Sequence, residues 1–246
     1  KTIVPSPVAP GFLLRAAAVH GYRRCCAVAL LVVLLGSRVQ AIESSQLEAL
    51  RVRADRGDLD AITALAAAYV AGDGVPQSFS AARKLYERAA EMRSAPAAFA
   101  LGTLFETGRG VTTDLAQAFK YYRMAAEQGY APAQFNVGNM YANGLGVQRD
   151  PFEAVLWFRQ AAEQNVPEAQ FNLALAYEKG QGVGRDDEQA RRWYERAADL
   201  GYARARYNLA LMFEEGRGGP ADATRAFELY AAAARQGYAP AQNNYG

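Results

Sequence analysis

Residues 133–144 of the chain read AQFNVGNMYANG, and this stretch decides the fold. Ala133, Val137, Met140 and Tyr141 are spaced i, i+4, i+7 and i+8, which is the pattern of one apolar face of an α-helix. Gly144 follows the last apolar residue, where a glycine commonly ends a helix in the left-handed conformation. The stretch therefore predicts an amphipathic helix that ends at Gly144.

A turn and a second helix follow directly. Residues 145–149 lack a helical pattern, and Asp150 is a preferred residue for capping a helix N-terminus. Pro151 suits the first position of the helix, and Glu153 suits a capping box. The side chains of Trp157 and Phe158 in this helix are expected to face the core. We call the first helix of such a pair helix A and the second helix B.

The pair recurs every 36 residues without an insertion. The first alanine of helix A recurs at Ala61, Ala97, Ala133, Ala169, Ala205 and Ala241. Glycines of the turn recur at Gly72 and Gly74, Gly108 and Gly110, Gly144 and Gly146, Gly180 and Gly182, and Gly216 and Gly218. Such a period is the signature of a repeat array. We place five repeats at about 58–93, 94–129, 130–165, 166–201 and 202–237, with a partial sixth up to residue 246.

Stacked helix pairs share a continuous core that a single pair lacks, so the period predicts an all-α solenoid. Residues 42–57 are expected to form an N-terminal capping helix that ends at Gly57. The chain ends inside a sixth helix A that begins at Ala239. We expect the natural protein to continue, and the alternative is that this stub is itself a cap.

Two further sets of recurring residues have structural explanations. Small residues of helix A, such as Gly102 and Gly138, are expected to let rings of helix B approach closely. The residues at the Asp150 position are expected to cap helix B, so we do not nominate them as catalytic: Ser78, Asp114, Asp150, Asp186 and Asp222.

The full pattern, A-x3-L-G-x2-Y-x2-G-x-G-V-x2-D-x3-A-x2-W-Y-x2-A-A-x2-G, resembles the Sel-1-like repeat family, a relative of the tetratricopeptide repeat. The resemblance covers residues 58–246, with departures at Ser78, Arg93, Asn165 and Gly219. It implies a right-handed α/α superhelix and an adaptor that assembles protein complexes, here an exported bacterial member. Some secreted members carry paired cysteines in each repeat. This chain lacks them there, so neither those disulfides nor any associated activity is carried over.

By analogy with tetratricopeptide solenoids, helix A is expected to line the concave side, where a protein or peptide partner would bind. With the recurring alanine as position one, position three carries an aromatic row: Phe99, Phe135, Phe171 and Tyr207. Positions four and seven add the remaining candidates: Asn136, Asn139, Asn172, Leu175, Asn208 and Leu211. Amides in such a row are able to grip an extended peptide backbone. We call the asparagines at position four, Asn136, Asn172 and Asn208, the Asn row. In the alternative interpretation, the rings pack between repeats and the Asn row forms hydrogen bonds to the next repeat.

The first 41 residues are predicted to be a targeting segment. Arg23 and Arg24 precede the apolar run CCAVALLVVLL, and the V-x-A sequence at 39–41 suits cleavage after Ala41. We therefore expect an exported protein, periplasmic or secreted. An uncleaved membrane anchor is the competing interpretation, although the run has about half the length needed to span a bilayer.

Cleavage would change the chemistry available to the chain. It removes five basic residues and no acid, so the formal net charge falls from +2 to −3. No basic face then suggests nucleic acid. His20, Cys25 and Cys26 leave as well, which argues against a Ser-His triad, a thiol nucleophile or a zinc site. We expect no cofactor.

Three classes of function follow, and the first is favoured. The chain is expected to be a protein-interaction scaffold and not an enzyme. A cell-envelope factor that binds glycan or peptidoglycan is the second, suggested by the aromatic row. A hydrolase is the third, because Glu214 and Glu215 form a carboxylate pair, but adjacent helix residues point in different directions.

Overall fold

The computed structural model describes residues 44–245, so the predicted targeting segment lies outside the described residues. These residues form twelve helices and no strands. The helices are α2 (Ser44–Asp55), α3 (Leu59–Ala71), α4 (Phe79–Glu91), α5 (Ala95–Thr107), α6 (Leu115–Ala126), α7 (Ala131–Asn143), α8 (Pro151–Glu163), α9 (Pro167–Lys179), α10 (Asp187–Asp199), α11 (Ala203–Glu215), α12 (Ala223–Arg235) and α13 (Ala239–Tyr245).

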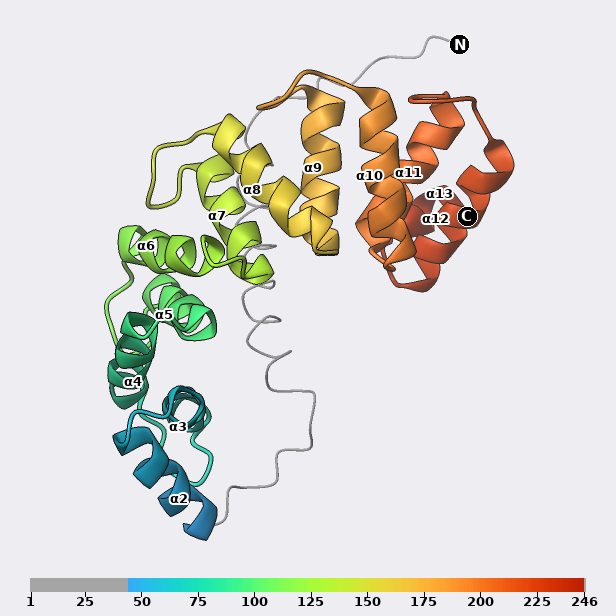
Figure 1. Ribbon diagram of the computed structural model, residues 1–246. Coiled ribbons are helices and arrows are strands. Elements are labelled where there is room, and N and C mark those ends of the chain that lie inside the picture. Colours follow the sequence, from blue (N-terminus) through green and yellow to red (C-terminus); the bar gives the residue numbers. More distant parts are fainter. Residues whose placement is uncertain (1–43, 246) are drawn as a thin grey trace. The chain divides into compact units, whose positions relative to one another are not determined.

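The helices stack in the order of the chain. Each helix packs on the one before it and the one after it, as Figure 1 shows for the run from α2 to α13. The odd-numbered helices from α3 to α13 are the A helices, and the even-numbered helices from α4 to α12 are the B helices. This arrangement confirms the all-α solenoid of helix pairs that the 36-residue period predicts.

Close approach of helix A and helix B depends on the small residue that the sequence indicates. A methyl group added at Gly102 would lie 2.5 Å from Cδ1 of Tyr122. At Gly138 it would lie 2.6 Å from Cδ1 of Phe158. Tyr122 is fully buried and Phe158 is nearly so. A ring therefore fills the space that a side chain on helix A would need.

The predicted caps are present. The side chains of Ser78, Asp114, Asp150, Asp186 and Asp222 each accept a hydrogen bond from a backbone N–H in the first turn of helix B. Gly144 adopts the left-handed conformation with φ +68° and ends α7 as expected. These residues have a structural role. The capping side chains accept hydrogen bonds from backbone N–H groups that lack a partner within the helix, and Gly144 allows the chain to leave the helix.

From the second repeat onward, the second glycine of the turn lies close to the preceding repeat. Gly146 has φ +68°, and a methyl group added there would lie 2.1 Å from the carbonyl oxygen of Leu115, the first residue of α6. The equivalent group at Gly182 would lie 2.0 Å from the carbonyl oxygen of Pro151, the first residue of α8. The turn backbone therefore rests directly on the start of the previous helix B.

Glutamines at position two of α7 and α9 tie these A helices to the helix B before each of them. Gln134 Nε2 donates to the carbonyl of Ala126 (3.3 Å), and Gln170 Nε2 donates to that of Ala162 (3.0 Å). Gln164 Nε2 completes the first site by donating to Gln134 Oε1 at 2.7 Å. The second site lacks this donor, because Leu200 stands where Gln164 would be.

Gln170 is consequently a weak point of the core. It is 1% exposed, and its Oε1 atom has no hydrogen-bond partner among residues 44–245. Leu200, by contrast, is 50% exposed, so its side chain contributes little to packing. A buried acceptor without a partner costs about 1–3 kcal/mol of stability.

Leu200→Gln is expected to place an amide donor at Gln170 Oε1, as Gln164 does one repeat earlier. The change should raise the free energy of unfolding by about 1 kcal/mol, measured by urea denaturation. Leu200→Ala is the matched control, since it removes the exposed leucine without adding a donor. Equal stability of the two variants would contradict the expectation.

Candidate functional site

The aromatic row at position three of helix A lies against rings of helix B. Each of its rings meets the helix B ring of the same repeat, at centroid distances of 5.4, 6.1, 5.5 and 5.6 Å, in the pairs Phe99–Tyr122, Phe135–Phe158, Phe171–Tyr194 and Tyr207–Tyr230. Phe99 and Phe171 are only 7% and 4% exposed, whereas Phe135 and Tyr207 are partly buried. The row therefore belongs largely to the core.

Three of these rings also contact the next repeat. Phe99, Phe171 and Tyr207 meet the tyrosine that precedes the following A helix, in the pairs Phe99–Tyr130, Phe171–Tyr202 and Tyr207–Tyr238. Of the two interpretations that the sequence left open for the row, these contacts favour packing between repeats. Contact of these rings with a partner stays a prediction.

The Asn row is partly committed to contacts within the fold. Asn172 Nδ2 donates to Asn139 Oδ1 of the preceding repeat at 3.2 Å, and Asn208 Nδ2 donates to the Tyr194 hydroxyl at 3.1 Å. The structure thus brings Asn139 and Asn172 together. Asn136 differs from both: it is 5% exposed, and its amide makes no hydrogen bond to another described residue. Its hydrogen-bonding groups are not used by the fold.

Leu175 and Leu211, the predicted residues at position seven of α9 and α11, are partly buried against one hydrophobic cluster. They share that position with Asn139, which is 9% exposed. Position seven therefore changes from polar in α7 to apolar in α9 and α11.

A set of hydrogen bonds between helices was not foreseen from the sequence. The tyrosine hydroxyl of helix B donates to a glutamate of helix A in three repeats, at 2.6, 2.8 and 2.8 Å, in the pairs Tyr122–Glu106, Tyr194–Glu178 and Tyr230–Glu214. The third repeat lacks both partners together, because Ala142 and Phe158 occupy those positions. The signal in the sequence is a glutamate followed 16 residues later by a tyrosine. Both residues are replaced together in the third repeat.

In the fourth repeat this bond is part of a longer chain of polar contacts. Arg217 Nη1 donates to Glu178 Oε1 at 2.7 Å, and Glu178 accepts from Tyr194, which accepts from Asn208. Burial, and then the Glu178 carboxylate, raise the pKa of Tyr194 above its usual range. Burial alone raises the pKa of Tyr86 to about 12. Asn208 is therefore held by a network that joins α9, α10 and α11.

One side of the A helices is uncharged in the first three repeats and carries charged residues in the fourth and fifth. Positions four, seven and eleven lie at i, i+3 and i+7 and so share one side of each helix. We call this stripe the helix A surface. It carries no charge in three helices: Ala64, Ala67 and Ala71 in α3, Ala100, Thr103 and Thr107 in α5, and Asn136, Asn139 and Asn143 in α7. Lys179 and Glu215 introduce charge at the same stripe in α9 and α11.

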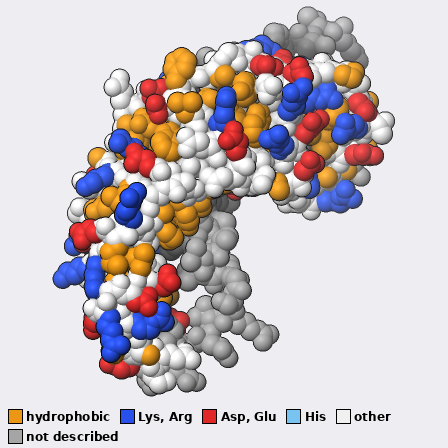
Figure 2. Space-filling model, viewed as in Figure 1, with side chains coloured by type: hydrophobic (Ala, Val, Ile, Leu, Met, Phe, Trp, Pro, Cys, Tyr) orange, Lys and Arg blue, Asp and Glu red, His pale blue; other side chains and the backbone are white. Residues whose placement is uncertain are grey.

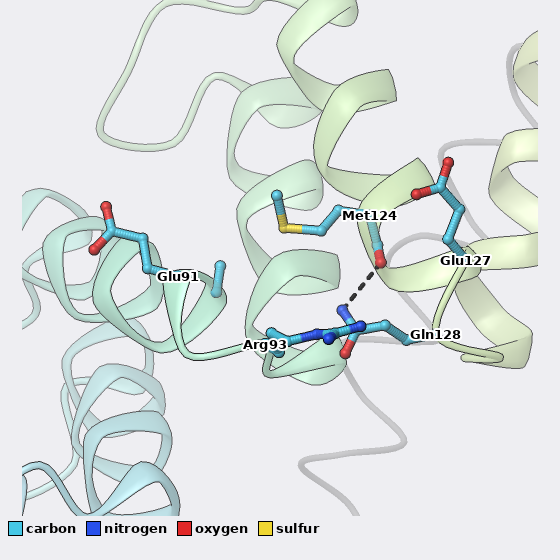
Figure 3. A pocket seen from close by; sticks show the side chains of 6 residues that line it. Glu91, Arg93, Met124, Glu127 and Gln128 are labelled. Carbon is cyan, nitrogen blue, oxygen red and sulfur yellow. Dashed lines mark hydrogen bonds between the residues drawn. The ribbon is translucent and has the colours of Figure 1, made fainter.

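A pocket of about 310 Å³ lies elsewhere, at the C-terminal ends of α4 and α6 (Figure 3). Its lining includes Glu91, Arg93, Met124 and Glu127, and Gln128 Nε2 donates to the carbonyl of Met124 at 3.0 Å. Arg93 keeps the left-handed conformation, with φ +66°, although it replaces the usual glycine. No predicted binding residue lines this pocket.

Residues 44–245 offer neither a metal site nor a membrane-spanning helix. No group of three acidic, histidine or cysteine side chains is arranged there to hold a metal ion. No helix in this range combines the length and the hydrophobicity that crossing a membrane requires.

Comparison with known proteins identifies the class. The Sel1 repeat model matches residues 59–94, 95–130, 131–166, 167–202 and 203–238, and the chain belongs to the Sel1 repeat family. These ranges begin one residue later than the repeats expected from the sequence. Sel1 repeat proteins generally act as protein-interaction scaffolds and typically bind protein partners.

Two solved structures are similar over most of the chain. One is c5321, a protective antigen of uropathogenic Escherichia coli, with 34% identity, a TM-score of 0.79 and 81% of this chain covered. This chain spans 43% of the length of c5321. The other is a Sel1 repeat protein from Oxalobacter formigenes, with 32% identity, a TM-score of 0.75, and coverage of 78% of this chain and 79% of that one. A search of curated proteins gave no match.

Tyr194→Phe tests the polar chain that holds Asn208. It removes the hydroxyl that bonds Glu178 and Asn208, and we expect a loss of about 1–3 kcal/mol in the free energy of unfolding, because hydrogen bonds to a charged group lie at the upper end of the scale. Tyr86→Phe is the control, since no hydrogen bond of the Tyr86 hydroxyl to another described residue is present. Equal losses in urea denaturation would show that the network adds nothing.

Proposed function

We propose that this chain is a scaffold that binds a protein partner in an extended conformation along the helix A surface. The observation that carries the proposal is Asn136, a residue that is 5% exposed and whose side-chain amide bonds no other described residue. A polar group in such a place is usually satisfied, within the protein or by water or a ligand. A peptide backbone offers both a donor and an acceptor to an amide.

The surroundings of Asn136 support an extended partner. The helix A surface of α3, α5 and α7 is built of Ala, Thr and Asn, so a backbone approaches without displacing long charged side chains. Asn139, which accepts a hydrogen bond from Asn172, lies three residues further along the same side. The proposal therefore centres on α7 and treats Asn172 and Asn208 as residues with structural duties as well.

We also propose that the protein is exported and that it acts by binding, without catalysis. The basic and apolar pattern of residues 23–41 supports export. N-terminal sequencing of the protein from its host should then begin at Ile42. An intact N-terminus would contradict this part of the proposal.

The test compares single alanine variants against a partner that co-purifies with the wild-type chain. Asn136→Ala should weaken binding by about tenfold while the free energy of unfolding changes by less than about 0.5 kcal/mol, because Asn136 has no bond to lose within the described structure. Asn208→Ala should lose stability, because Tyr194 loses a donor. Gln148→Ala, in an exposed turn, is the control for binding.

Two outcomes would contradict the proposal. One is partner binding that is unchanged in Asn136→Ala. The other is retention of the wild-type chain on purified peptidoglycan with no protein partner, which would favour an envelope factor that binds glycan.

A further inference from the structure

Two large apolar side chains of α8 face solvent. Phe152 is 70% exposed and Leu156 is 53% exposed, and their i, i+4 spacing places them on one side of the helix. The other B helices carry small or charged residues at these two positions: Ser80 and Lys84, Ala116 and Lys120, Glu188 and Arg192, and Thr224 and Glu228. The apolar pair is therefore specific to the third repeat and is not required by the repeat architecture.

Neither side chain is needed to complete the core. The inward positions of α8 are filled by Ala154, Val155, Phe158, Ala161 and Ala162, all buried. Figure 2 shows hydrophobic side chains that reach the surface in the region of α8, among charged ones. Exposed apolar groups that fold stability does not explain mark interaction sites in many soluble proteins.

Three cations without a carboxylate partner flank the pair. Lys120 occupies the Leu156 position in α6, Arg149 precedes Phe152 by three residues, and Arg159 follows Leu156 by three. None of them lies within salt-bridge distance of a carboxylate of the described residues. By comparison, Arg123 and Arg192, on the outer sides of α6 and α10, pair with Glu127 and Glu188.

Arg159 is the most constrained of these cations. Its Nη2 atom donates to the Tyr177 hydroxyl at 2.8 Å, while its Nε atom is buried and has no hydrogen-bond partner in the described part of the chain. The neutral hydroxyl leaves the guanidinium charge uncompensated. A carboxylate brought in by a partner would pair with this charge in a geometry that arginine favours.

We propose that Phe152, Leu156, Lys120, Arg149 and Arg159, here called the α8 patch, bind an acidic amphipathic helix of a partner protein. The apolar side of such a helix would cover Phe152 and Leu156, whose i, i+4 ridge suits ridges-into-grooves packing of two helices. Its flanking carboxylates would face the three cations, which steers association and fixes orientation. The α8 patch lies on the B helices α6 and α8 and on the turn before α8, and it shares no residue with the helix A surface.

This inference does not rest on the proposed function of the helix A surface. A chain with both surfaces would hold an extended segment on its A helices and a helical segment on α8, which suits a protein that brings partners together. Failure at one surface leaves the other intact, so the two proposals are tested by different variants.

The probe is a fluorescent synthetic peptide of about 18 residues that forms a helix of about five turns. This glutamate peptide carries leucines on one side and glutamates on both flanks of that side. A control peptide, the lysine peptide, carries lysines in place of the glutamates. Anisotropy titrations use the full chain. We expect binding of the glutamate peptide, weakened by added salt, and little binding of the lysine peptide.

Two variants and a control locate the binding. Phe152→Ser with Leu156→Ser should weaken binding of the glutamate peptide at least tenfold, and Lys120→Glu with Arg149→Glu should weaken it several-fold. Leu200→Ser changes a similarly exposed leucine directly after α10 and should leave binding unchanged. Circular dichroism should show the same helix content in all of them, because every substituted side chain is exposed.

Several results would overturn the proposal. These are equal binding of the two peptides, unchanged binding by the Phe152→Ser, Leu156→Ser variant, or loss of binding in Leu200→Ser. Failure of the wild-type chain to bind the glutamate peptide would also overturn the proposal. This holds whether the chain instead sediments with phosphatidylglycerol vesicles or forms a dimer through Phe152 and Leu156.

Discussion

The contact between a turn glycine and the helix B of the preceding repeat is the constraint on which the rest of the structure depends. Gly146 and Gly182 each place their backbone where a methyl group would lie about 2 Å from a carbonyl oxygen. No other residue fits such a place, and the positive φ angle at each reinforces the choice. The contact fixes how far each repeat sits from the last, and therefore which side chains meet between them.

The side-chain contacts between repeats follow from that spacing. Phe99 reaches Tyr130, and Asn172 reaches Asn139, because each repeat is set at a constant distance from its neighbour. Contacts of this kind join neighbours only, so the stability of the stack is close to a sum of repeats and their interfaces. A surface substitution in one repeat then has little effect on distant ones. That independence lets the third repeat carry Phe152 and Leu156 at positions that are small or charged elsewhere.

Much of the fold could be predicted from the sequence because the same pattern of residues recurs in five repeats. The period fixes the helix pairs, Gly144 marks the end of α7, and Asp150 marks the start of α8. The capping acids were correctly assigned a structural role. The solvent side of helix A was harder to predict, because periodicity alone does not distinguish a ring that packs between repeats from one that faces a groove. Phe99 and Phe171 each pack against one tyrosine of helix B and another that precedes the next helix A, which one helical pattern does not reveal.

The hydrogen bonds between helices could not be predicted from the repeat pattern either. Tyr194 is buried in the core, and its hydroxyl joins Glu178 and Asn208 across three helices. Predicting that bond requires the distance between two helices, which the helical period of each does not contain. The same holds for Asn136: its sequence position does not reveal that its amide bonds no other residue of 44–245, whereas Asn172 and Asn208 do form such bonds.

The most direct test of the central contact compares two glycines with similar backbone angles. Gly146 and Gly129 have φ +68° and +83°, but a methyl group at Gly129 meets nothing within 4 Å. Alanine at Gly129 should lower the free energy of unfolding by about 1–2 kcal/mol, the cost of the left-handed conformation. Alanine at Gly146 should cost at least about 2 kcal/mol more, because the turn must also move away from α6. Equal losses in the two variants would contradict the account.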